Sequence, residues 1–243
     1  MNHAMEPAMN DHEIVSADQW TEARRALMAK EKEFLQLRDQ LSAARRDLPW
    51  ERVQAPYVFE GADGHESLAD LFGKHSQLIV YHFMFAPEWE NGCKSCSFWA
   101  DNFNGVTAHL AARDVALAAV SRAPYSRLKA FARRLGWQFK WVSSANTDFN
   151  YDYHVSFRPE DVAAGKAQYN SAPYSGKMSD LPGISVFYKD SDGAIYHTYS
   201  TYARGLDPVN AAYQLLDLVP KGRDEAALPQ PMAWVKYHDL YTA

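Results

Sequence analysis

The stretch LIVYHFMFAPEWENGCKSC, residues 78–96, joins an apolar run to the two cysteines of the chain. The run at residues 78–85 predicts a buried strand, and a loop containing proline and glycine leads from it to Cys93. From Cys93 to about Arg113, apolar residues return at helical spacing and predict a helix. A strand, a loop and a helix that starts at a cysteine pair therefore form the central unit of the expected fold.

The cysteine pair is a C-x-x-C motif, a spacing that random placement gives in about one chain in a hundred. The start of a helix stabilises a thiolate, and a second thiol one turn further along can close a disulfide. We therefore expect Cys93 to be the nucleophile, with the positive charge of Lys94 beside it, and Cys96 to be the resolving thiol. Glu88 and Glu90 oppose this ionisation. The alternative is two small buried residues without a redox role.

Composition narrows the functional classes. The chain has 243 residues, 47% of them hydrophobic, which suits one α/β domain with extensions. Its formal charge of −5, without a basic block, argues against nucleic acid or an anionic membrane surface as the main partner. The first residues lack a secretory signal, and no apolar stretch approaches the roughly 20 residues of a membrane span. We expect a cytoplasmic protein, in which a cysteine pair is catalytic or metal-binding rather than a structural disulfide.

A metal site is the less favoured use of the motif. Zinc takes about four protein ligands, and a C-x-x-C motif supplies two. The nine histidines show no H-x₃₋₅-H spacing, although a distant His82 or His154 would be free to complete a site. We expect neither a metal nor another cofactor.

The rest of the chain predicts an alternation of strands and helices. Apolar runs at 115–121 and 138–143, with a helix from Tyr125 to Leu135 between them, imply parallel strands joined by crossovers. A hairpin is predicted for 184–199, around the turn DSDG. We divide the chain into a flexible N-terminus (1–15), a helical extension (16–50) and a main domain (51–243) with an insertion around 144–180.

The helical extension begins with a capping box at Ser16 and Gln19 and ends at Pro49. Apolar residues recur every three or four positions along it, interrupted at Lys30. These residues are Trp20, Ala23, Leu27, Phe34, Leu37, Leu41, Ala44 and Leu48. Two interpretations stay open: a helix packed on the domain, or an arm that forms a homodimer.

The order of elements and the position of Pro182 before the hairpin resemble the thioredoxin fold. The stretches 57–73 and 119–126 are similar to peroxiredoxin-like members of that superfamily. More narrowly, residues 85–101 resemble a bacterial thioredoxin-like family of unknown function, as do three later stretches. These are residues 187–190, 199–205 and 220–225. The resemblance covers most of the chain from about residue 15 onward.

The resemblance implies a fold and a place for substrate. The fold is α/β and thioredoxin-like, with a central mixed sheet flanked by helices. Pro182 corresponds to a cis-proline that faces the dithiol, where a disulfide substrate pairs as an extra strand. Two positions differ from familiar relatives. Trp89 lies four residues before Cys93, where thioredoxin has Trp directly before its first cysteine. Glu90 stands where peroxiredoxins carry Thr or Ser.

The candidate site residues follow from these observations. We expect Cys93 and Cys96 to be catalytic, and Pro182, Trp89, Gly92 and Trp99 to bind substrate. Lys94, Glu90, His82 and Arg204 are candidates for a supporting role. The ordinary alternatives are a core histidine at 82, core tryptophans and a solvated arginine at 204.

The sequence therefore predicts a thiol–disulfide oxidoreductase that acts on an unidentified disulfide or peroxide. Its partners would be protein or small-molecule disulfides and thiols. The alternative is a non-catalytic thioredoxin-fold module that binds a partner or senses redox state.

Overall fold

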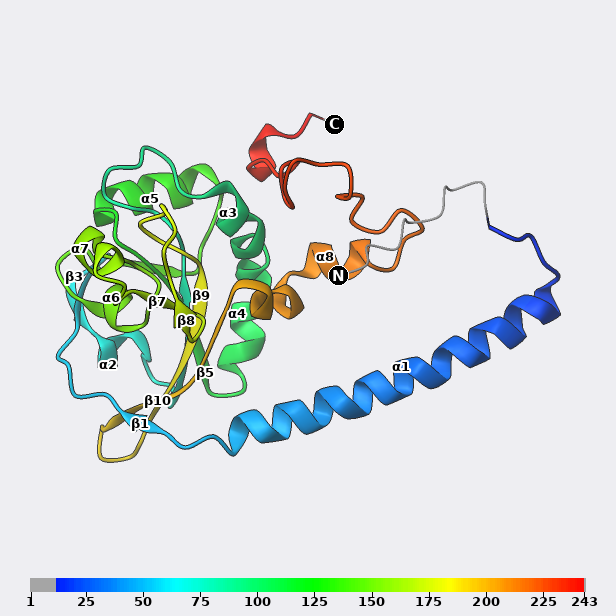
Figure 1. Cartoon of the computed structure of the whole chain (residues 1–243). Helices are drawn as coiled ribbons and strands as arrows, with labels where there is room; N and C mark the ends of the chain where they lie inside the picture. Colours follow the sequence, from blue (N-terminus) through cyan, green and yellow to red (C-terminus); the bar gives the residue numbers. More distant parts are fainter. Residues whose placement is uncertain (1–11, 243) are drawn as a thin grey trace.

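A mixed eight-stranded sheet forms the centre of the computed structural model, which describes residues 12–242 (Figure 1). The strand order is β1-β10-β9-β4-β5-β6-β2-β3, and β7 and β8 form a separate two-stranded sheet. The strands are β1 (Glu51–Arg52), β2 (Val58–Gly61), β3 (Gly64–Ser67), β4 (Gln77–His82), β5 (Val115–Ser121), β6 (Lys140–Ser143), β7 (Gln168–Tyr169), β8 (Ala172–Pro173), β9 (Gly183–Lys189) and β10 (Ile195–Tyr202).

Short helices connect most of these strands, and one long helix precedes them. The α-helices are α1 (Ala17–Arg46), α2 (Leu68–Leu71), α3 (Lys94–Ala100), α4 (Phe103–Ala111), α5 (Tyr125–Arg134), α6 (Phe149–Asp152), α7 (Pro159–Ala163) and α8 (Ala211–Leu216). Two 3₁₀ helices, η1 (Ala203–Val209) and η2 (His238–Leu240), lie in the C-terminal part. Among residues 12–242, no helix is long and apolar enough to cross a membrane.

The central four strands have the thioredoxin topology. β4 and β5 are parallel and are joined through α3 and α4, while β9 is antiparallel to β4 and β10 is antiparallel to β9. β6 extends the sheet in parallel beside β5, and β2 and β3 complete that edge. The fold is therefore α/β and thioredoxin-like, as the sequence predicted.

Two apolar clusters pack on opposite faces of the sheet. Because side chains alternate along a strand, Val80 and Tyr81 of β4 enter different clusters. The Tyr81 face is covered by α3, α4 and α5, which contribute Trp99, Phe103 and Phe131. The other face is covered by α2 and α6. The dithiol lies on the Tyr81 face.

The helix predicted to run from Cys93 to about Arg113 is divided into α3 and α4. Asn102 stands at the break, and its side-chain amide donates to the carbonyls of Phe98 and Trp99. These bonds give partners to backbone carbonyls at the end of α3, and α4 begins after Asn102.

Helix α1 extends away from the sheet (Figure 1) and none of its residues is buried. The predicted capping box is present, with Ser16 and Gln19 bonded to each other's backbone N–H groups. The interpretation of α1 as a helix packed on the domain is therefore wrong. Of the predicted flexible terminus at 1–15, residues 1–11 lie outside the described residues. The predicted insertion at 144–180 contains α6, α7, β7 and β8.

Candidate functional site

The dithiol lies where the loop after β4 meets α3. Cys93 is the N-cap of α3, and its backbone N–H donates to the Met84 carbonyl at 3.0 Å. The Cys93 sulfur accepts a hydrogen bond from the backbone N–H of Cys96 at 3.5 Å. Cys93 is half-buried and Cys96 is buried, and both are free thiols. Of the two residues, Cys93 is therefore the more accessible to an incoming molecule.

The two thiols differ in acidity. A hydrogen bond from the Cys96 thiol, aided by backbone N–H groups of the first helical turn, lowers the pKa of Cys93 to about 7 against the opposing effect of burial. Burial raises the pKa of Cys96 well above its usual value, and the hydrogen bond to Cys93 adds to the effect. Cys93 is thus the thiol that ionises near neutral pH, and Cys96 is the partner that keeps its proton.

Tyr81 of β4 supports the buried thiol. Its hydroxyl donates to the Cys96 carbonyl at 3.4 Å. Complete burial raises the pKa of Tyr81 well above its usual value, so the hydroxyl stays neutral and acts as a donor. Tyr81 has no signal in the sequence, because one tyrosine in an apolar strand is not distinguishable from a core residue.

A cavity of about 1020 Å³ opens onto the dithiol. Three predicted site residues, Trp99, Pro182 and Arg204, line it together with both cysteines. Tyr81, Met84, Leu206, Tyr213 and Met232 contribute most of its large apolar side chains. Its volume is at the upper end of the range for small-molecule sites.

The C-terminal segment (residues 219–242) covers one side of this cavity. The Tyr237 hydroxyl donates to the Gly92 carbonyl at 2.6 Å, and Lys94 donates to the Ala233 carbonyl at 3.3 Å. The rings of Phe98 and Trp234 meet edge to face with centroids 5.4 Å apart. The segment therefore contacts α3 and the residue before Cys93 directly. The place of this segment beside the dithiol could not be predicted from the sequence, because the segment lacks helical or strand periodicity.

Glu225 fastens this segment internally. One of its carboxylate oxygens accepts hydrogen bonds from the Tyr213 hydroxyl at 2.8 Å, the Trp234 indole at 2.6 Å and the Met232 N–H at 3.0 Å. These bonds join the segment to α8. The result is a wall beside the dithiol that is bonded to α8.

Pro182 differs from the expectation in its peptide bond. No cis peptide bond occurs in residues 12–242, so the predicted cis-proline is wrong. The Pro182 carbonyl accepts a hydrogen bond from the Tyr169 hydroxyl at 2.7 Å, and that hydroxyl accepts from the Ala203 N–H at 3.0 Å. This bridge from the insertion gives the Pro182 carbonyl a hydrogen-bond partner.

Two predicted substrate-binding residues do not line the cavity. Gly92 is buried against Phe83, and a Cβ at this position would lie 2.6 Å from the Phe83 ring. Trp89 packs at the edge of the core, and its carbonyl accepts from Arg127 at 2.6 Å. Both residues shape the loop before Cys93 rather than contact the cavity.

The four supporting candidates are separated in space. Arg204 lines the cavity and pairs with Asp207 at 3.1 Å. Lys94 is exposed and bonds to the C-terminal segment, while Glu90 is exposed on the loop. His82 lies on the opposite face of the sheet, since it follows Tyr81 in β4. Only Arg204 remains a candidate for contact with substrate.

His82 belongs to a row of hydrogen-bonded polar side chains that runs across strands β4, β9 and β10. Its Nε2 lies 2.9 Å from the Ser185 hydroxyl, which lies 2.8 Å from Ser200, and His197 Nε2 lies 2.7 Å from Ser200. Burial lowers the pKa of His82 to about 3. The imidazole is therefore neutral and structural, as the ordinary alternative proposed.

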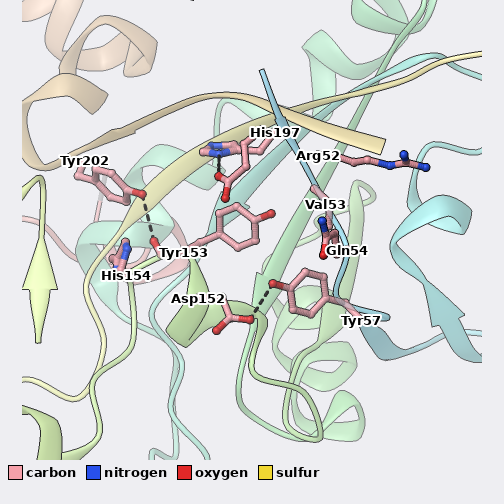
Figure 2. Close-up of a pocket in the computed structure, with 10 residues that line it drawn as sticks. Arg52, Val53, Gln54, Tyr57, Asp152, Tyr153, His154, His197 and Tyr202 are labelled. Atoms are coloured by element: carbon pink, nitrogen blue, oxygen red, sulfur yellow. Dashed lines mark hydrogen bonds and ion pairs between the residues drawn. The ribbon is translucent and has the colours of Figure 1, made fainter. Parts of the chain in front are cut away.

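His197 also borders a second cavity, of about 570 Å³, on this opposite face (Figure 2). Tyr153 lies between His197 and Tyr57 in this view, and Tyr57 donates to Asp152 at 2.7 Å. Within residues 12–242, no group of three or more His, Cys, Asp or Glu side chains is arranged to hold a metal ion.

Comparison with known proteins gives a family. A model described as a bacterial protein of unknown function, DUF899, matches residues 9–241. No curated protein matches the chain. A solved structure of Xanthomonas campestris Peroxiredoxin Q is 15% identical to this chain, with a TM-score of 0.46. The match covers 70% of this chain and 98% of the Peroxiredoxin Q chain. Peroxidoxin BcpB from Mycobacterium tuberculosis shares 13% identity, with coverages of 69% and 97% and a TM-score of 0.45.

Proposed function

We propose that this chain, which belongs to the DUF899 family of bacterial proteins of unknown function, is a thiol–disulfide oxidoreductase. The observation that carries the proposal is the asymmetry of the dithiol. Cys93 is accessible with a pKa of about 7, and Cys96 is buried with a raised pKa. A nucleophile and a resolving thiol need these two properties.

The reaction proceeds by two exchange steps. The Cys93 thiolate attacks one sulfur of a disulfide, the S–S bond breaks, and one thiolate leaves and takes a proton from water. Cys96 then loses its proton to solvent and attacks the Cys93 sulfur, which expels the second thiolate and closes the Cys93–Cys96 disulfide. The substrate is reduced to two thiols, and the protein is oxidised by two electrons. A dithiol reductant restores the starting state.

The chain's own residues prepare both steps. Hydrogen bonds from Cys96 stabilise the thiolate before attack. Burial and the neighbouring Cys93 thiolate keep Cys96 protonated before the first step. Once Cys93 is part of a mixed disulfide it carries no charge, so it no longer opposes the ionisation of Cys96. We place this chemistry in the cytoplasm, where reducing conditions return the dithiol to its reduced form.

The test compares wild type with Cys93→Ser and Cys96→Ser. Bis(2-hydroxyethyl) disulfide serves as substrate, and dithiothreitol as reductant. With dithiothreitol in excess, we expect multiple turnovers in wild type. With the disulfide alone, we expect an accumulated mixed disulfide on Cys93 in Cys96→Ser and no adduct in Cys93→Ser. Mass spectrometry detects the adducts.

Two results would contradict the proposal. A wild type that forms no reversible Cys93–Cys96 disulfide in a redox buffer would leave a binding module as the better interpretation. A disulfide that forms once but supports no turnover with excess reductant would favour redox sensing.

A further inference from the structure

We propose a substrate class for the dithiol, an inference that rests on the proposed function: compact disulfides that are uncharged or cationic, rather than protein disulfides or dianionic ones. Three observations carry it. They are the C-terminal segment beside Cys93, the occupied backbone groups at Pro182, and the charges around the cavity.

The C-terminal segment blocks the approach of a protein chain along α3. It contacts Gly92, Lys94 and Phe98, which are the residues immediately around the motif. Two further contacts fix its end, because Asp239 forms two bonds with Arg134 of α5 at 2.8 and 3.0 Å. The dithiol is therefore reached through the cavity and not across a flat surface.

Two of the backbone groups that an extended peptide would use beside Pro182 are already paired. Strand addition needs unpaired N–H and C=O groups. The Pro182 carbonyl already accepts from Tyr169, and the Leu181 N–H already donates to the Val155 carbonyl at 2.8 Å. A protein disulfide would therefore have to displace part of the insertion as well as the C-terminal segment.

The charges around the cavity select against anions. Its lining holds four carboxylates against two guanidinium groups, which leaves a net charge of minus two. These residues are Asp207, Asp217, Asp224, Glu225, Arg204 and Arg223. Arg223 is paired with both Asp207 and Asp217, at 3.1 and 2.8 Å, whereas Arg204 makes one bond to Asp207 and stays exposed at the rim. A dianionic disulfide therefore meets a lining with an excess of two negative charges, whereas a cation is attracted to it.

The experiment measures the rate at which reduced wild-type protein is oxidised by four disulfides. Three are compact and differ in charge: cystamine, bis(2-hydroxyethyl) disulfide and dithiodiglycolate. Insulin is the protein disulfide. Each rate constant is divided by the rate constant of the same disulfide with free dithiothreitol, which removes intrinsic reactivity. We expect cystamine and bis(2-hydroxyethyl) disulfide to exceed both dithiodiglycolate and insulin by about tenfold or more at low ionic strength.

The outcomes separate this inference from the proposed function. Normalised rates that are equal, or highest for dithiodiglycolate or insulin, would overturn the substrate class and leave the oxidoreductase in place. Failure of all four disulfides to oxidise the dithiol would overturn the proposed function itself. In Trp234→Ala, which loosens the C-terminal segment, the ratio of the insulin rate to the bis(2-hydroxyethyl) disulfide rate should rise. Trp50→Ala, which lies at the Tyr188 side of the sheet, is the matched control.

A separate observation concerns α1, and from it we infer that α1 pairs with α1 of a second copy of this chain. Five large apolar residues follow one another at intervals of seven, the last just beyond the end of the helix. They are Trp20, Leu27, Phe34, Leu41 and Leu48, and all are exposed. A strict seven-residue repeat is the pattern of a helix that winds around another helix.

The length and charges of α1 point to its own copy as the occupant. α1 has 30 residues, whereas the next longest helix among residues 12–242 has 10, so within the described chain only α1 itself is long enough to match the seam. Glu33 and Arg38 flank Phe34 on opposite sides of that seam. In a parallel pair, each Glu33 lies opposite Arg38 of the partner subunit, and the flanks attract.

Sedimentation or light scattering of the full chain tests the pairing. Wild type should have twice the monomer mass of 27.5 kDa. A double variant, Leu27→Ser with Leu41→Ser, should have the monomer mass. Leu35→Ser is the matched control, because Leu35 is exposed on α1 outside the seam, and it should remain dimeric. A monomeric wild type, or a double variant that stays dimeric, would overturn the inference, and circular dichroism verifies that the domain is folded.

Discussion

The hydroxyl of Tyr237 donates a hydrogen bond to the carbonyl of Gly92 at 2.6 Å, and this bond ties the end of the chain to the residue before Cys93. The two residues are 145 positions apart in sequence. Arg134 lies over the Tyr237 ring at 5.0 Å and also holds Asp239. The reactive sulfur thus lies beside a wall built from the last residues of the chain. Movement of that wall would change access to the sulfur without changing the sheet.

Removal of this bond should open the site. A hydrogen bond of this kind contributes about 1 kcal/mol net, so Tyr237→Phe should raise the population with a displaced C-terminal segment about fivefold. The alkylation rate of Cys93 by a bulky maleimide, measured by mass spectrometry, should rise accordingly. Tyr188→Phe, in β9 on the far side of the domain, is the control. An unchanged rate in Tyr237→Phe would show that the segment does not limit access.

The close approach of Gly92 to Phe83 gives a second prediction. A methyl group at Gly92 would lie 2.6 Å from the Phe83 ring, so Gly92→Ala should lower the free energy of unfolding by about 1–3 kcal/mol. Gly105→Ala is the matched control, since no atom lies within 4 Å of its Cβ position in α4. That change should be neutral or raise the free energy of unfolding by up to about 1 kcal/mol. Urea unfolding measures both, and equal effects would contradict the proposed crowding at Gly92.

The acidity of Cys93 predicts the pH dependence of its reactivity. With a pKa of about 7, the rate of alkylation by iodoacetamide should rise between pH 6 and pH 8 with a midpoint near 7. Cys96 should stay unmodified across that range, because burial raises its pKa. Peptide mass spectrometry assigns the two sites. A midpoint near the ordinary thiol value of 9.0 would show that the local hydrogen bonds do not stabilise the thiolate.

The same shift predicts a pH dependence of stability. The pKa of Cys93 is depressed on folding, so its stabilising contribution is complete above the unfolded value near 9 and is lost as the pH falls through about 7. The difference in free energy of unfolding between wild type and Cys93→Ser should therefore increase in favour of wild type from pH 7 to pH 9. A difference that is flat over this window would contradict the shift.

The sequence predicted the parts of the site that are formed by residues close together along the chain. The apolar run at 78–85 and the motif at Cys93 and Cys96 were sufficient for the strand, the helix start and the identity of the dithiol. Strand alternation separates His82 from Tyr81, but which face carries α3 depends on tertiary packing. The partner of the Pro182 carbonyl is Tyr169, which belongs to an insertion without a regular pattern. Contacts of the C-terminal segment with Gly92 and α3 span more than a hundred residues, and no local signal indicates them.

Lys30 provides a final prediction about the α1 seam. Lys30 lies three residues after Leu27 and four residues before Phe34. In a seven-residue repeat, a residue at this position also faces the partner helix. A charged residue there weakens pairing, because each ammonium group loses hydration and approaches the other copy. Lys30→Leu should therefore lower the dimer dissociation constant by about tenfold or more, measured by sedimentation over a concentration series. Lys32→Leu, two residues away on another face of α1, should change it little. A dissociation constant that rises in Lys30→Leu, or falls equally in both variants, would contradict a specific seam and indicate non-specific association.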